Sequence, residues 1–134
     1  SRSLARFLQE RGKNVKLVLA DIPTLRKDFL IYLCKNTGIE MDFLDCTVSN
    51  PVPNLPKIDI CIATEFFEHV NDPIFYFEKF DAVISNHGLL VTNIRDHEED
   101  FLHISPSLTS LRKKIQDCQY SEVLPYQLFL KNND

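Results

Sequence analysis

The sequence predicts an α/β protein with an open, mostly parallel sheet flanked by helices. Short apolar runs typical of strands alternate with stretches of helical periodicity along the chain. Strands that alternate with helices form right-handed crossovers, which place the strands parallel to one another. One run, at 58–63, is apolar at nearly every position, which is typical of a strand buried on both faces of a parallel sheet.

Four elements are predicted in the first part of the chain, with helix and strand alternating. Apolar residues at helical spacing predict an opening helix that ends at Gly12, and a β-prone run predicts a strand at 15–20. A second helix opens at Pro23, because a first turn does not need the N–H that proline lacks. It ends at Gly38, and a second strand follows at 39–44. The apolar residues on one face of the second helix are Leu25, Phe29, Tyr32 and Leu33.

The second part of the chain opens with a loop at 46–57, where three prolines prevent regular pairing. The apolar strand at 58–63 follows. Asp72 and Pro73 then provide the N-cap and first turn of a helix. The apolar stripe of this helix is Ile74, Phe77, Phe80 and Ile84. The remaining predictions are a turn at 86–88, a strand at 89–94, a helix with Leu108, Leu111, Ile115 and Cys118 on one side, and strands at 120–123 and 126–130.

The composition is that of an ordinary globular chain, and we expect a single domain over residues 1–134. The 134 residues carry a formal charge of −4, and no apolar stretch approaches the roughly 20 residues that a membrane-spanning helix needs. The acidic balance argues against a large nucleic-acid interface, which requires a basic face. Four widely spaced cysteines predict free thiols in a reducing compartment, so we expect a cytoplasmic protein.

Open parallel sheets bind ligands beyond the carboxyl ends of their strands, so the residues that follow each strand are the candidate site. Asp21 follows the first strand. It either accepts two hydrogen bonds from a ribose diol or caps the helix that opens at Pro23. Asp45 follows the second strand and either accepts from an exocyclic amine, such as that of adenine, or is a polar loop residue.

A third candidate group follows the apolar strand, at 64–70. If this stretch is helical, Glu65, Glu68 and His69 share a face because they lie at positions i, i+3 and i+4. Such a group could hold a divalent cation, or His69 could act as a base near neutral pH. The alternative is a solvated helix start, where the helix dipole favours glutamate. The loop after the last central strand adds three candidate substrate contacts: Arg95, His97 and His103.

The order of these pieces resembles the class I S-adenosylmethionine-dependent methyltransferases, from Leu4 to about Leu130. The sequence IDICIATEFFEHVNDP at 58–73 is similar to the fourth strand and the E-x-x-E-H-V-x-D-P stretch of small-molecule and quinone-type members. The sequence NHGLLV at 86–91 is similar to the family's entry to its fifth strand. The resemblance implies a Rossmann-like fold and methyl transfer to an O, N or C nucleophile of a small-molecule acceptor.

The resemblance also implies a role for individual residues. Asp21 would bind the ribose hydroxyls of S-adenosylmethionine, and Ile22 would flank the adenine. Asp45, together with the backbone of Cys46, would read the adenine edge. The residues expected to border the methionine moiety are Ala63, Thr64 and Glu65. His69 would remove a proton from the acceptor. Some relatives bind a divalent cation through a Glu-x-x-Glu-His stretch, which extends that possibility to Glu65, Glu68 and His69.

The glycine-rich loop that approaches the methionine part in this family has no counterpart in the chain, whose three glycines are Gly12, Gly38 and Gly88. We therefore expect the first strand to be missing here and to precede Leu4 in a longer natural protein. Two alternatives stay open: a non-catalytic methyltransferase-like binding or scaffold domain, and an NAD(P)-binding oxidoreductase. The Glu-x-x-Glu-His-Val run argues against the oxidoreductase.

Overall fold

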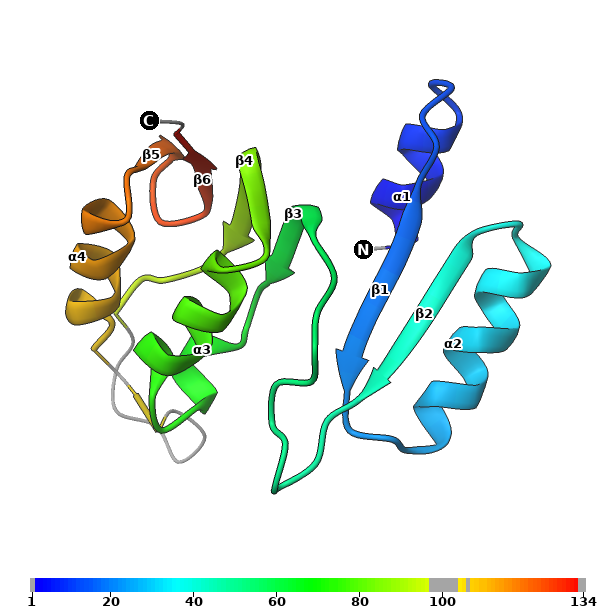
Figure 1. The fold of residues 1–134 in the computed structure, drawn as a ribbon, viewed down its shortest axis with the longest axis horizontal. Coiled ribbons are helices and arrows are strands. Elements are labelled where there is room, and N and C mark those ends of the chain that lie inside the picture. Colours follow the sequence, from blue (N-terminus) through cyan, green and yellow to red (C-terminus); the bar gives the residue numbers. More distant parts are fainter. Residues whose placement is uncertain (1, 97–103, 106, 133–134) are drawn as a thin grey trace. The chain divides into compact units, whose positions relative to one another are not determined.

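The computed structural model describes residues 2–96, 104–105 and 107–132. Its elements fall into two compact units, Ser1–Asn54 and Leu55–Asp134, which Figure 1 colours from blue to cyan and from green to red. The boundary lies within the predicted loop at 46–57, which contains no helix or strand. The α/β class is confirmed, whereas a single domain over 1–134 stays a prediction.

The described part of the first unit consists of α1 (Arg2–Gln9), β1 (Lys16–Asp21), α2 (Leu25–Asn36) and β2 (Glu40–Asp45). The two strands are parallel, with Lys16 opposite Glu40 and Asp21 opposite Asp45. This arrangement follows from the chain order, since α2 is the crossover that a parallel pair requires. The core of the unit is small and contains Ala5, Cys34 and Ile39, with Val15, Leu17 and Met41 packed against it.

The apolar face predicted for α2 does not pack against the strands of its unit. Leu25, Phe29 and Tyr32 are exposed by 89%, 58% and 64%. The helix packs on β2 through its opposite side, where Cys34 is buried. It begins at Leu25 instead of Pro23, because the Oγ1 of Thr24 accepts a hydrogen bond from the Arg26 N–H at 3.3 Å and caps the first turn.

The described part of the second unit contains a four-stranded sheet with the order β3–β4–β6–β5. Its elements are β3 (Ile58–Ala63), the 3₁₀ turn η1 (Phe67–His69), α3 (Pro73–Asp81), β4 (Ile84–Thr92), α4 (Thr109–Asp117), β5 (Tyr120–Leu124) and β6 (Leu128–Lys131). β3 and β4 are parallel, whereas β6 is antiparallel to both β4 and β5. β5 and β6 run antiparallel because only a short turn joins them.

The described strands therefore form two sheets, not the single, mostly parallel sheet that the sequence predicts. The expectation that 58–63 is buried on both faces is wrong, because Asp59 and Ile62 are exposed. β3 also lies at an edge of its sheet, with β4 as its neighbour. Ile62, for example, is 39% exposed. A short apolar run does not by itself distinguish an edge strand from a central one.

The helix α3 begins as predicted. The carboxylate of Asp72 accepts a hydrogen bond from the Phe75 N–H at 2.9 Å, and Pro73 is the first helical residue. Phe77 is fully buried, whereas Ile84 belongs to β4 and not to the helix. The core of this unit consists of Ala63, Phe67, Phe77, Ile84, Leu90, Ile94, Leu108, Leu111, Ile115, Tyr120 and Phe129.

The predicted turn at 86–88 is a bulge inside β4. Ile84 pairs with Ile58, but Leu89 pairs with Ile60, so the β4 side of the ladder contains extra residues. Gly88 is required there, since a Cβ atom at this position would lie 2.7 Å from the carbonyl oxygen of Ser85. The strand consequently starts earlier than the sequence predicts.

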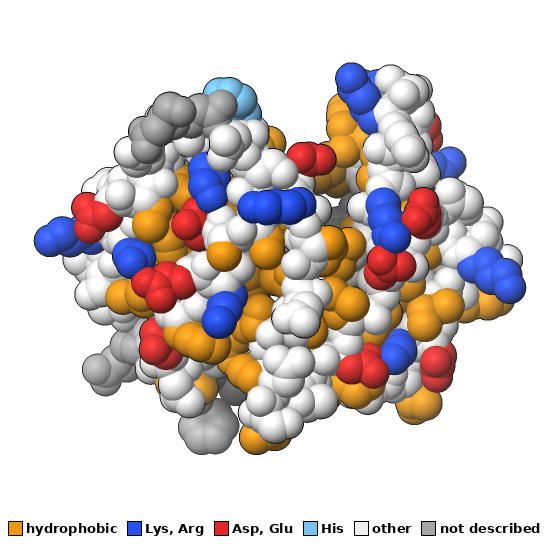
Figure 2. Space-filling view, viewed as in Figure 1, with side chains coloured by type: hydrophobic (Ala, Val, Ile, Leu, Met, Phe, Trp, Pro, Cys, Tyr) orange, Lys and Arg blue, Asp and Glu red, His pale blue; other side chains and the backbone are white. Residues whose placement is uncertain are grey.

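Two further expectations concern the surface and the thiols. No helix among the described residues is long and apolar enough to span a membrane. On the face drawn in Figure 2, basic and acidic side chains are interspersed and form no continuous basic patch. All four cysteines are free thiols, as predicted.

Candidate functional site

The first candidate group lies at the carboxyl ends of β1 and β2. Asp21 and Asp45 are register partners on adjacent parallel strands, so their Cα atoms are about 4.8 Å apart. Both residues are exposed. Asp21 does not cap α2, because Thr24 is the N-cap. The two carboxylates thus lie at the ends of neighbouring strands of one sheet, as the sequence predicts.

Each of these aspartates uses one carboxylate oxygen within the protein. The Oδ1 of Asp21 accepts a hydrogen bond from the N–H of Ile22 at 2.8 Å, and the Oδ1 of Asp45 lies 2.7 Å from the Nζ of Lys27. The Oδ2 atoms have no hydrogen-bond partner among the described residues, so both can accept from a ligand. Ile22 is 64% exposed and presents an apolar surface beside them.

Cys46 lies close to both carboxylates. Burial raises the pKa of its thiol, and the charges of Asp21 and Asp45 raise that pKa further. Its backbone N–H donates to the carbonyl oxygen of Asp21 at 2.9 Å. This N–H is therefore engaged with β1, and a ligand could use it only by displacing that bond.

The second candidate group belongs to the second unit and begins at the end of β3. Ala63 is buried, and its carbonyl oxygen accepts a hydrogen bond from the Thr92 hydroxyl at 3.0 Å. Thr64 and Glu65 are exposed. Glu65 has a φ of 51°, in the left-handed region that costs a non-glycine residue about 1 kcal/mol or more, so its conformation must be held by its surroundings.

Asn93 holds Glu65 through two hydrogen bonds. Its Oδ1 accepts from the backbone N–H of Glu65 at 2.6 Å, and its Nδ2 donates to the Oε1 of the Glu65 carboxylate. The sequence prediction missed Asn93, because it extended the strand to Ile94. Asn93 is the first residue after β4, the strand next to β3, so its place at the strand end was the signal that could have identified it.

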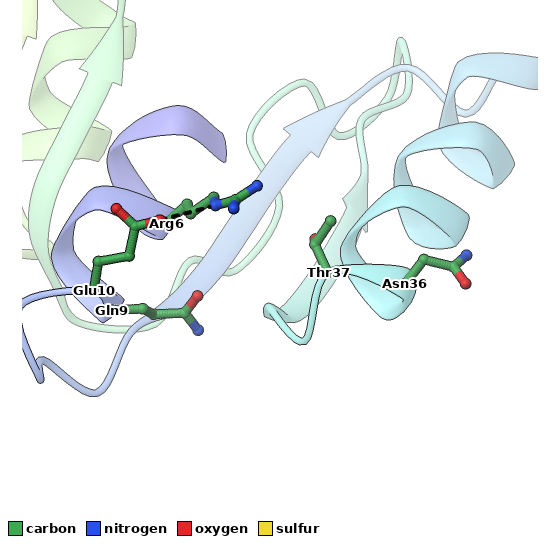
Figure 3. Close-up of a pocket in the computed structure, with 5 residues that line it drawn as sticks. All are labelled: Arg6, Gln9, Glu10, Asn36 and Thr37. Atoms are coloured by element: carbon green, nitrogen blue, oxygen red, sulfur yellow. Dashed lines mark hydrogen bonds and ion pairs between the residues drawn. The ribbon is translucent and has the colours of Figure 1, made fainter.

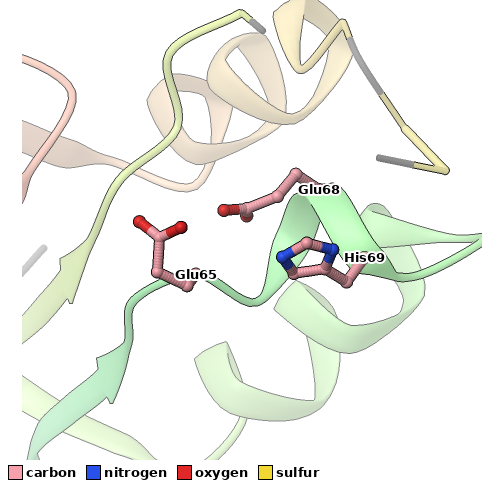
Figure 4. Close-up of side chains that lie close together, drawn as sticks. All are labelled: Glu65, Glu68 and His69. Carbon is pink, nitrogen blue, oxygen red and sulfur yellow. The ribbon is translucent and has the colours of Figure 1, made fainter. Parts of the chain in front are cut away.

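Glu65, Glu68 and His69 lie close together, but not on one face of an α-helix. Glu65 is in the left-handed turn, and the other two residues belong to the 3₁₀ turn η1. One potential ligand atom from each residue lies within 4.8 Å of the other two. Figure 4 shows the three side chains gathered near one another. Glu68 is completely buried, whereas Glu65 and His69 are exposed. The interpretation as a solvated helix start is wrong for Glu68.

The loop after β4 is described only in part. Arg95 is exposed, and its guanidinium lies 5.7 Å from the ring centroid of Tyr126. The candidate substrate contacts His97 and His103 lie outside the described residues. The Arg112 guanidinium donates one hydrogen bond to each carboxylate oxygen of Asp96, and this bidentate contact lowers the pKa of Asp96 to about 2.

A pocket in the first unit lies away from the predicted site. Its walls are polar, and the Nε of Arg6 pairs with the Oε1 of Glu10 at 3.0 Å across one side. The pocket involves the ends of α1 and α2, which precede the strands, whereas Asp21 and Asp45 end them. The residues drawn in Figure 3 are Arg6, Gln9, Glu10, Asn36 and Thr37. This position does not match the carboxyl-end site expected for an α/β sheet.

Comparison with known proteins adds no assignment: no family model, no curated protein and no solved structure matches the chain. The two residue groups themselves are therefore the basis on which a function is proposed.

Proposed function

We propose that the protein binds S-adenosylmethionine and transfers its methyl group to an O, N or C nucleophile of a small molecule. The observation that supports this most is the pairing of Asp21 with Asp45 at the carboxyl ends of two adjacent parallel strands. An adenosine group presents a ribose diol and an exocyclic amine, and both are donors that carboxylates accept well.

The free oxygens of the two aspartates suit this division of roles. The Oδ2 of Asp21 can accept from the ribose hydroxyls while Oδ1 keeps its bond to the Ile22 N–H. Lys27 fixes the other carboxylate by its contact with the Oδ1 of Asp45, which leaves Oδ2 for the adenine amine. The exposed side chain of Ile22 offers an apolar surface to the base. The methionine-side roles of Ala63, Thr64 and Glu65 stay predictions.

When bound, S-adenosylmethionine supplies an electrophilic methyl group on a sulfonium. The protein's contribution to such a transfer is mainly orientation, and effective molarities of about 10⁵ M or more are attainable by this means. The role of His69 as the base that takes the acceptor's proton stays a prediction. An unchanged pH–rate profile in a His69→Ala variant would contradict it.

The test is a calorimetric titration of S-adenosylmethionine into the full-length natural protein. Because a charge-assisted hydrogen bond contributes about 1.5–3 kcal/mol, Asp21→Asn and Asp45→Asn should each weaken binding by roughly 10- to 100-fold. The matched control is Asp42→Asn, which removes an exposed carboxylate of β2 that pairs with Lys16. Equal affinity in all variants, or no binding by the natural protein, overturns the proposal.

A binding or scaffold domain without turnover is the second candidate. The positions of the three glycines favour this candidate. Gly12 and Gly38 have positive φ and lie just after helices, and Gly88 lies in the β4 bulge. None of the three directly follows a described strand, which is where the resemblance implies a glycine-rich loop. Transfer of a labelled methyl group from S-adenosylmethionine to small molecules of a cell extract would exclude this candidate.

A further inference from the structure

Tyr126 has a backbone conformation that aromatic residues rarely adopt. It lies in the turn between β5 and β6, with a φ of 61°. Glycine and asparagine tolerate this left-handed region, whereas a bulky side chain is strained there. Two hydrogen bonds hold the backbone in place: the Tyr126 N–H donates to the Oε1 of Glu122 at 2.6 Å, and the Tyr126 carbonyl oxygen accepts from the Ile94 N–H at 3.0 Å. A strained residue that its surroundings maintain suggests a function for its side chain.

The turn that contains Tyr126 lies beside the carboxyl end of β4. Ile94, which bonds to Tyr126, directly follows Asn93, which holds Glu65. Two strained residues, Glu65 and Tyr126, are therefore bonded to consecutive positions just after this strand. The Tyr126 side chain is 41% exposed, so a ligand can reach it. This end of the strands is where ligands of α/β sheets bind.

Two guanidinium groups lie near the Tyr126 ring, and they differ in their partners. The central carbon atoms of Arg95 and Arg112 are each 5.7 Å from the ring centroid. Arg112 donates to both carboxylate oxygens of Asp96. These hydrogen bonds raise the pKa of Arg112, and the charges of Asp96 and Glu122 raise it further. The two acidic residues near the ring therefore act on Arg112.

Arg95, in contrast, keeps its charge and its donors available. It is exposed, and it makes no ion pair or hydrogen bond with any residue that the structure describes. A guanidinium presents five N–H donors in a rigid fork, which matches two oxygens of a carboxylate or a phosphate. An aromatic ring beside the guanidinium orients its plane.

We propose that Arg95, supported by the ring of Tyr126, binds one anionic group, a carboxylate or a phosphate, of a ligand at the carboxyl end of β4. The guanidinium donates two parallel hydrogen bonds to two oxygens of the anion, and the ring holds the guanidinium in the plane that this requires. The identification of this ligand with the methyl acceptor rests on the proposed function, whereas the anion site does not. With both, the acceptor is an acid or a phosphate ester and not a neutral molecule.

The experiment is the labelling of arginines by phenylglyoxal in the full-length natural protein, with the rate at each arginine read by mass spectrometry. The probes are acetate and inorganic phosphate, each compared with chloride at equal ionic strength. We expect at least one of the two anions to slow the labelling of Arg95 by about fivefold or more, because a bound anion occupies its donors. The matched control is Arg26, an exposed arginine of α2 whose rate should change by less than about twofold. Slowing by acetate as well as phosphate indicates that a carboxylate fits, and slowing by phosphate alone indicates a phosphate ester.

A Tyr126→Asn variant tests the ring separately, because asparagine tolerates the left-handed backbone of this turn. The anion concentration that halves the labelling rate of Arg95 should rise by about two- to fivefold, while the temperature of thermal unfolding is retained. Unchanged protection in this variant would overturn the role of the ring.

Two results would overturn the anion site itself. One is an equal labelling rate of Arg95 in chloride and in both anions. The other is an equal slowing of Arg95 and Arg26, which would reflect a general effect of the anions on arginine. The labelling requires neither S-adenosylmethionine nor methyl transfer, so failure here is distinguishable from failure of the proposed function.

Discussion

Two pairs of carboxylates lie near strand ends, and they differ in burial and in partners. One pair is Asp21 with Asp45, and the other is Glu65 with Glu68. The aspartates are exposed, and each already accepts one bond within the protein. Glu68 is buried, and its carboxylate has no hydrogen bond to any described residue, while Glu65 is held by Asn93. Water can solvate the first pair, so folding does not require a ligand there. Glu68 lacks that option, and the stability of its unit should depend on what binds to this carboxylate.

The largest effect is expected from removing the buried charge. Without metal, Glu68→Met should raise the free energy of unfolding by about 1–4 kcal/mol, because an apolar side chain of similar size replaces a partnerless carboxylate. Asp45→Asn should change it by less than about 1 kcal/mol, as is usual for an exposed ion pair. Urea unfolding in the presence of a chelator measures both. A destabilised Glu68→Met protein would contradict the comparison.

The next effect concerns the support of Glu65, one of the three residues that could together hold a divalent cation. Asn93→Ala removes both hydrogen bonds to that residue and should lower the affinity for Mn²⁺ by about 10- to 100-fold. A suitable control is Asn132→Ala, whose amide donates to Ser121 at the end of β6. Calorimetry with Mn²⁺ distinguishes the two variants. Equal affinities would mean that Asn93 serves only the fold.

A further carboxylate, Asp96, is exposed yet fully partnered by Arg112. Its pKa is lowered to about 2, so its contribution to stability is present above its unfolded pKa and is lost as the pH falls toward 2. Arg112→Met should cost about 1 kcal/mol at pH 7 and flatten the acid dependence between about pH 4 and 2. Thermal unfolding at several pH values measures this. The same acid dependence in variant and natural protein would be evidence against it.

The smallest effect uses Cys46 as a probe of the exposed pair. Asp21→Asn or Asp45→Asn removes a negative charge that raises the pKa of this thiol, so more thiolate forms at pH 8. Alkylation by iodoacetamide should become faster by less than about threefold, because burial is the larger cause of the shift. Cys61, whose pKa burial raises to about 12, is an internal control in the same mass spectra. An unchanged alkylation rate at Cys46 would mean that the charges of Asp21 and Asp45 do not raise the pKa of its thiol.

Local signals predicted most of the elements correctly. The run at 58–63 has the bounds of β3, and Asp72 with Pro73 marks the start of α3, because capping and strand propensity act over a few residues. The same signals failed for the exposed face of α2 and for the edge position of β3. Those depend on which neighbours a face or an edge meets, and periodicity carries no such information.

In the candidate sites, too, local signals predicted which residues come together, whereas features that depend on packing were not predicted. The places of Asp21 and Asp45 followed from strand ends alone, since parallel neighbours bring such residues together. The grouping of Glu65, Glu68 and His69 was predicted on the assumption of a regular helix, yet it results from a left-handed residue and a 3₁₀ turn. The burial of Glu68 could not be read from the spacing, because it depends on the packing of the whole second unit.

The bulge in β4 decides which residue faces the turn that contains Glu65. A regular ladder from the pair Ile58–Ile84 would place Leu89 opposite Ala63, and the next position along β4 would be Leu90. With the bulge, Thr92 lies opposite Ala63, and Asn93 comes next. The bulge, which leaves no room for a Cβ atom at Gly88, thereby places the Asn93 amide beside the turn that contains Glu65, where a regular ladder would place an apolar side chain.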